Sequence, residues 1–176
     1  ARGGVPGGEG IGGSKKNASE GAGLQWYETH YWKEAREAAR MRYEEALRRE
    51  AAAEPLRDCA CDICGMSMES RGFEEIGVVT QIGAVTLGRR YYICPTVGHG
   101  GYAPFDRLLG LHNHASKGMQ DWICYAAAKE AFAGATETLA VFSGVALSHA
   151  TVQEVAEWHG QQIDAAQKAL VERVFD

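Results

Sequence analysis

The sequence lacks the features that would place it in a membrane or in the secretory pathway. No apolar run approaches the roughly 18 residues that a membrane-spanning helix needs, and no apolar leader precedes the cysteines. The five cysteines, an odd number, also argue against a disulfide framework of the secreted kind. We therefore expect a cytoplasmic protein with no membrane partner.

An excess of positive charge is missing as well. The 176 residues hold 18 Lys and Arg against 23 Asp and Glu, which gives a net charge of -5. A broad basic surface for nucleic acid is therefore not expected. The sequence also has no recognisable Ser-His-Asp set, paired carboxylate motif or phosphate-binding loop, so no catalytic centre is expected in this chain.

Four of the cysteines lie in two short motifs, about thirty residues apart. The first motif, Cys59–Gly65, contains Cys-x-x-Cys-Gly, a tight turn that directs two thiolates at one point. The second motif, Cys94–Gly100, has Val97 where the usual pattern has another cysteine. Two such motifs at this spacing predict a closed, structural zinc site.

The expected zinc ligands come from both motifs. They are Cys61, Cys64 and Cys94, with His99 as the preferred fourth ligand and Cys59 as the alternative. Because Val97 breaks the usual pattern, a ribbon that has lost its metal and is held together by packing is the other interpretation.

The chain divides into segments of different composition, which together predict an α+β fold. The expected parts are a disordered glycine-rich leader at 1–23, a long charged helix at 24–56, a zinc-ribbon-like β-hairpin at 57–107 and an all-α helix-turn-helix bundle at 108–176. Within the bundle, helices are expected from Ser116, over 136–142, and from Ser148 or Thr151. Residues 101–115 read as a loop, and Gly160 as a kink.

Two groups of residues are candidates for contacting DNA. Residues 138–148 have the pattern of a helix-turn-helix core, which would present Ser148, His149, Thr151 and Gln153 to a major groove. No Lys or Arg lies within 136–160, so a plain three-helix core fits the same pattern.

The second group is the cationic and aromatic run Arg89, Arg90 and Tyr91. It could contact a nucleic-acid backbone. Arginines on an edge strand also serve solubility, which is the alternative interpretation.

Several separated motifs then recur in the order of a known family. They are Cys61–Met68, Val79–Pro95, Gly98–Gly100, Pro104–Leu111, Ala135–Leu139, Ser143–Val145 and Leu147–Val152. Together they resemble the N-terminal region of ISKra-type insertion-sequence transposases. The resemblance covers roughly residues 59–160 and is specific because several motifs share one order.

The resemblance implies a zinc-ribbon and helix-turn-helix region that binds transposon-end DNA ahead of a DDE-type catalytic domain. It also implies a prokaryotic cytoplasm, with association to the nucleoid on DNA. About sixteen residues follow the helix-turn-helix, too few to gather three carboxylates around two metal ions. The alternative function is a protein-interaction module, or a homodimer formed through the long helix, that carries a structural zinc ribbon and binds no DNA.

Overall fold

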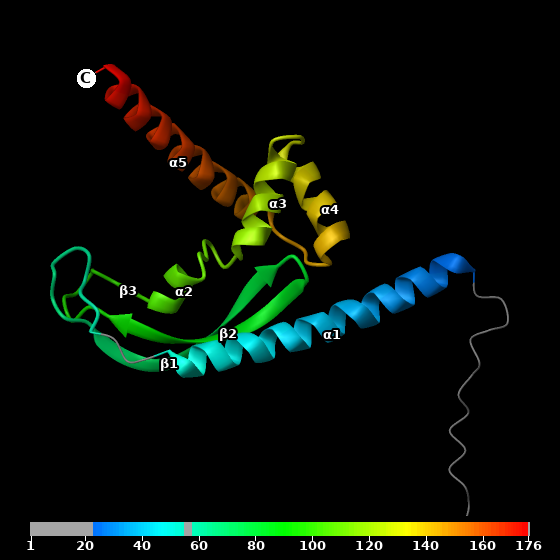
Figure 1. Cartoon of the computed structure of the whole chain (residues 1–176), viewed down its shortest axis with the longest axis horizontal. Helices are drawn as coiled ribbons and strands as arrows, with labels where there is room; N and C mark the ends of the chain where they lie inside the picture. The colour runs from blue at the N-terminus through cyan, green and yellow to red at the C-terminus, as the bar shows by residue number, and fades with distance from the viewer. Residues whose placement is uncertain (1–22, 55–57, 176) are drawn as a thin grey trace, which may run out of the picture. The chain divides into compact units, whose positions relative to one another are not determined.

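The computed structural model describes residues 23–54 and 58–175, and it confirms the predicted α+β fold class (Figure 1). The elements in chain order are α1 (Leu24–Ala53), β1 (Glu69–Thr80), β2 (Gly83–Ile93), β3 (Gly101–Tyr102), α2 (Pro104–Leu108), α3 (Lys117–Ala127), α4 (Phe132–Ser143) and α5 (His149–Phe175). The predicted leader lies outside the described residues, apart from Gly23.

The chain forms two compact units, of which the first ends at Ala35 and the second spans Arg36–Asp176. The described part of the first unit is the beginning of α1. The rest of α1 belongs to the second unit, where Arg40 forms ion pairs with Glu37 at 2.6 Å and with Glu44 at 2.8 Å. Pairs at this spacing favour the helix.

The hairpin of β1 and β2 turns at Gln81 and Ile82, within the turn that the sequence predicts. The Thr80 hydroxyl donates to the carbonyl of Gly83 at 2.7 Å, and Gly83 has a positive φ of 124°. One face of the hairpin is buried against the second half of α1 and against α2. The buried side chains are Leu47, Ala51, Val78, Val85, Leu87 and Phe105.

The segment expected to be a loop at 101–115 contains β3 and α2. Pro104 stands at the start of α2, where its missing N–H costs no hydrogen bond. A helix of five residues is too short to show the period by which helices are found in a sequence. After α2, the chain returns to the hairpin, where the N–H of Val79 donates to the carbonyl of His114 at 2.8 Å.

Helices α3, α4 and α5 share one apolar core. Its centre is Met119, Ile123, Ala135, Leu139, Val152 and Val155. The Ser116 side chain caps α3 by accepting from the N–H of Met119, as the sequence predicts. Helix α4 begins at Phe132, before the expected Thr136, and α5 continues through Gly160 to Phe175 without a break.

Candidate metal centre

The residues of the two cysteine motifs meet at the open end of the hairpin. Cys61 and Cys64 precede β1, Cys94 follows β2, and His99 lies in the loop that leads to β3. Because β1 and β2 are antiparallel, the start of one strand lies beside the end of the other. The pairing of Glu69 with Ile93 is the last rung of this ladder, and it brings the two motifs together.

The backbone folds each motif into a compact turn. In the first, the N–H of Cys61 donates to the carbonyl of Met66 and the N–H of Gly65 to the carbonyl of Cys61, both at 2.8 Å. Gly65 has a φ of 70°, a conformation that other residues adopt only under strain. In the second turn, the N–H of Cys94 donates to the carbonyl of Gly100 at 3.0 Å.

Four ligand atoms converge at this point. One atom from each of Cys61, Cys64, Cys94 and His99 lies within 4.8 Å of all the others. The Sγ atoms of Cys64 and Cys94 are 3.6 Å apart, and His99 Nδ1 lies 3.8 Å from Cys61 Sγ and 3.7 Å from Cys94 Sγ. Zinc bonds of about 2.0–2.3 Å in a tetrahedron give ligand separations of about 3.5–3.8 Å. The donor set and its spacing therefore fit a zinc ion.

Backbone donors favour the thiolate form of the first two cysteines. The N–H groups of Cys64 and Ile63 hold the pKa of the Cys61 thiol below its usual value. The N–H of Met66 does the same for the pKa of Cys64. Burial raises the pKa of Cys94, against a backbone donation from Thr96 to its sulfur at 3.4 Å. Thiolates are the form that binds zinc.

Cys59, the alternative fourth ligand, is not among these four. It is buried in the packing beneath the site, together with Met68, Tyr92 and the partly buried Tyr102. Burial raises the pKa of the Tyr102 hydroxyl, and its interactions with Cys59 raise it further. Val97 is 97 % exposed. In the second motif, His99 rather than the residue at position 97 is therefore placed to act as a ligand beside Cys94.

An ion pair that the sequence did not suggest joins the first motif to α2. Arg107 donates to Asp62, which stands between Cys61 and Cys64, and its guanidinium lies 4.0 Å from the centre of the Tyr102 ring. The Asp62 carboxylate raises the pKa of Arg107. No spacing rule links residues so far apart in the chain, so only the fold reveals the contact.

The arginines proposed for DNA contact differ in exposure. Arg89 is 7 % exposed and pairs with Asp106 at 2.9 Å and with Glu74 at 3.4 Å, so it is directed into the protein. Arg90 is half-buried, with its guanidinium 4.4 Å from the centre of the exposed Phe73 ring. Tyr91 is half-buried beside Arg89. Phe73 and Arg90 lie opposite each other in the β1–β2 ladder. The predicted strands did not specify this register.

The four residues proposed at the start of α5 have two kinds of surroundings. Ser148 caps the helix, since its hydroxyl accepts from the N–H of Thr151 at 3.0 Å and lies 2.9 Å from the Thr151 hydroxyl. His149 is exposed, and Gln153 donates to Glu157 at 2.7 Å. Ser148 and Thr151 therefore shape the helix end, while His149 and Gln153 lie on its surface.

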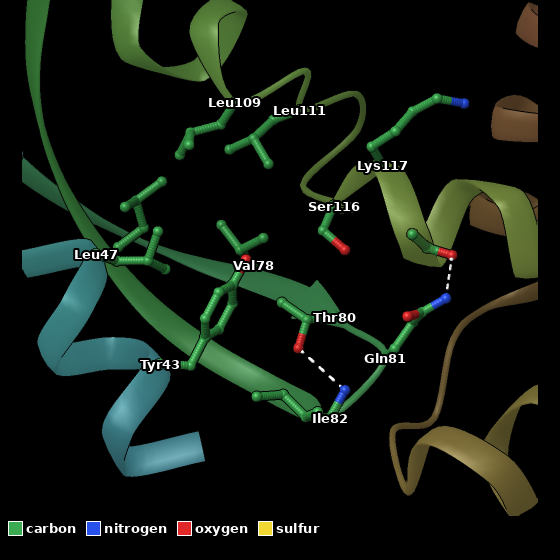
Figure 2. A pocket seen from close by; sticks show the side chains of 12 residues that line it. Tyr43, Leu47, Val78, Thr80, Gln81, Ile82, Leu109, Leu111, Ser116 and Lys117 are labelled. Carbon is green, nitrogen blue, oxygen red and sulfur yellow. Dashed lines mark hydrogen bonds between the residues drawn. The ribbon is translucent and has the colours of Figure 1, made fainter. Parts of the chain in front are cut away.

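A separate pocket of about 390 Å³ lies between the second half of α1, the hairpin and the start of α3 (Figure 2). Most of its lining is apolar, with Leu47, Val78 and Leu111 among the side chains. Two of its polar side chains are bonded within the protein: Thr80 accepts from the N–H of Ile82, and Gln81 donates to the carbonyl of Gly118 (Figure 2). We assign no ligand to this pocket.

Within the described ranges, no helix is both long enough and apolar enough to cross a membrane. Comparison with protein-family models, with curated proteins and with solved structures gave no match in any of the three searches.

Proposed function

We propose that this chain is the DNA-binding or assembly region of a transposase-like protein, built on a structural zinc ribbon, and that its DNA is a transposon end. The observation that carries the proposal is the convergence of Cys61, Cys64, Cys94 and His99 at the open end of the hairpin. Four protein ligands would fill a tetrahedral zinc, which leaves no open position for a substrate. The role of the metal is therefore to hold the two motifs together.

A zinc ion would contribute a cross-link between residues that the chain separates by more than thirty positions. A short hairpin has little stability alone, and metal binding contributes to the free energy of folding. The ligands hold the open end of the hairpin, while the Asp62–Arg107 pair joins the same end to α2.

The proposed DNA surface has one part on the hairpin and one on α5. On the hairpin, Arg71 is exposed and Arg90 lies against Phe73, a combination of positive charge and aromatic surface that suits a nucleic-acid backbone. On α5, His149 and Gln153 are exposed uncharged polar side chains of the first turns, beside the exposed Glu154. Helices α4 and α5 are joined by the short segment 144–148, as in a helix-turn-helix.

The test is binding of the metal-loaded protein to a labelled transposon-end duplex, measured by fluorescence anisotropy over a range of salt concentrations. The double variant R71A/R90A should weaken binding and lower the salt slope by about one for each phosphate contact that is lost. R48A is the matched control, because Arg48 is an exposed arginine on α1 that pairs with Glu45. Equal binding by all three proteins, or no binding at low salt, would contradict the proposal.

A protein-interaction module is the second candidate, and one observation favours it. The exposed face of α5 carries Glu154 and Glu157, and residues 136–160 contain no Lys or Arg. An acidic helix face suits a basic protein partner better than a phosphate backbone. Lack of binding to any duplex at low salt, with correct folding and bound zinc, would select this candidate.

A further inference from the structure

The three cysteines of the candidate metal centre differ in their access to solvent. Cys61 and Cys94 are each 5 % exposed, whereas Cys64 is an exposed residue of the turn that follows Cys61. The fourth residue, His99, is half-buried. Oxidation of cysteine follows the exposure of its sulfur. A dissolved oxidant therefore reaches this centre first at Cys64.

A second cysteine lies beside the exposed one. The Sγ atoms of Cys64 and Cys94 are 3.6 Å apart, although thirty positions separate the two residues in the chain. Thr96 contacts both sulfurs, since its N–H donates to Cys94 Sγ at 3.4 Å and its hydroxyl lies 3.9 Å from Cys64 Sγ. An accessible cysteine next to a partner that can attack its oxidised sulfur is the arrangement of a redox sensor.

We propose that a peroxide converts the zinc-loaded centre into a zinc-free form that is joined by a disulfide between Cys64 and Cys94, and that a thiol reductant reverses the change. The inference rests on the zinc ribbon proposed above and is independent of DNA binding. Disulfides of cytoplasmic proteins are usually transient and redox-sensing, which suits a reversible bond at an exposed cysteine.

The step consumes one peroxide for each chain. The Cys64 thiolate attacks the peroxide, the O–O bond breaks, and the products are the Cys64 sulfenic acid and hydroxide. The Cys94 thiolate then attacks the Cys64 sulfur, which forms the S–S bond and expels a second hydroxide. Two electrons have passed from the two thiolates to the peroxide. Cys61 and His99 alone remain as ligands, too few for a structural zinc site.

The proposed disulfide would form a cross-link at the same place in the fold as the metal. Cys64 precedes β1 and Cys94 follows β2, so the bond joins the two strands at the open end of the hairpin. A bond between Cys61 and Cys64 would lie within the first motif and would leave the second motif unattached. Oxidation at Cys64 and Cys94 therefore removes the metal, keeps the hairpin cross-linked and leaves Cys61 as a free thiol.

The experiment uses the full chain with the substitutions C59S and C124S, which leave only the three cysteines of the centre. Neither substituted residue belongs to the group of four ligands. The metal content is measured first and should be one zinc per chain. Hydrogen peroxide is then added, and a chromophoric chelator should detect release of that zinc. The matched controls are the same protein without peroxide, which should keep its zinc, and the unmodified chain, which should release it as the variant does.

Peptide mass spectrometry with alkylation before and after reduction locates the bond. In the oxidised protein, Cys61 should be alkylated directly, and Cys64 and Cys94 only after reduction. Dithiothreitol with added zinc should restore the metal content. The oxidised protein should also melt at a higher temperature than the reduced, metal-free protein, because the hairpin is cross-linked only in the former. A bond between Cys61 and Cys64, or irreversible oxidation of Cys64 without a disulfide, would overturn the proposal.

The metal content at the start separates this proposal from the one on which it rests. A folded chain that binds no zinc before oxidation contradicts the zinc ribbon, and the exchange of metal for disulfide with it. A chain that binds one zinc and keeps it in excess peroxide contradicts the exchange alone. Circular dichroism before oxidation establishes that the C59S/C124S variant is folded like the unmodified chain.

Discussion

Arg89 on β2 donates its Nε hydrogen to the carboxylate of Asp106 on α2 at 2.9 Å, and this pair fastens the short helix to the hairpin. The Arg89 side chain is 9 % exposed and that of Asp106 is 27 % exposed. The neighbouring Arg90 projects from the other side of the strand onto Phe73. Two adjacent arginines therefore have different roles, because successive side chains of a strand point to opposite faces.

Replacing Arg89 by methionine should destabilise the protein by about 3 kcal/mol, because Asp106 keeps its charge without its partner. R90M should cost no more than about 1 kcal/mol, the scale of an exposed cation–aromatic contact. Urea unfolding of the two variants measures the difference. A loss of DNA affinity without loss of stability in R89M would contradict this assignment and would restore Arg89 as a direct DNA contact.

Removal of a metal ligand should abolish stoichiometric zinc binding. C61S leaves three ligands and should lose the ion and lower the melting temperature, because the hairpin is no longer cross-linked at its open end. C59S should retain one zinc per chain, since Cys59 lies in the packing below the site. Elemental analysis of both proteins gives the metal content. Retention of zinc in C61S together with its loss in C59S would assign the fourth position to Cys59.

The elements with a strong local signal were predictable from the sequence. The alternation around the glycine turn gave the hairpin, the Ala, Glu and Arg periodicity gave α1, and Ser116 gave the start of α3. Helix α2 was missed because five residues show no period. The glycine at 160 predicts a kink, yet α5 continues through it, since a single glycine lowers helix stability by only about 1 kcal/mol.

The members of the candidate site were predictable from the spacing of the cysteines and the histidine and from the affinity of their side chains for metal ions. Thiolates and an imidazole at fixed intervals pointed to the four residues that the structure brings together. Contacts that depend on register and packing were not predictable. The burial of Arg89, the placement of Phe73 under Arg90 and the Asp62–Arg107 pair arise only when the hairpin, α2 and the first motif pack together.

Two glycines of the helical part should respond oppositely to alanine. Gly144 ends α4 with a φ of 68°, and a Cβ there would lie 2.3 Å from Nη1 of Arg36. G144A should cost about 1–2 kcal/mol for the left-handed backbone alone. Gly160 lies within α5 with no neighbour within 4 Å of an added Cβ, so G160A should gain up to about 1 kcal/mol. Thermal unfolding of both variants checks the signs.

Acidification should weaken the junction between α3 and α5. His159 lies 2.9 Å from Gln120 Oε1, and burial lowers its pKa below the usual value of about 6.5. The charges nearby are those of Lys117, which lowers this pKa further, Asp121, which raises it, and His112, which lowers it. The folded protein therefore favours neutral His159. This contribution to stability is complete above about pH 6.5 and is lost as the pH falls through the lower, folded value.

The variant H159Q isolates this effect from the pH dependence of the metal ligands, which both proteins share. The melting temperature of the unmodified protein should fall more steeply between about pH 7 and pH 5 than that of H159Q. Only the unmodified protein has an imidazole at this position, and this imidazole binds a proton more tightly in the unfolded chain than in the folded protein, so low pH favours unfolding. Parallel curves for the two zinc-loaded proteins would contradict the assignment. A steeper fall in H159Q would mean that the folded state binds the proton more tightly than the unfolded chain, the opposite sign to the one expected here.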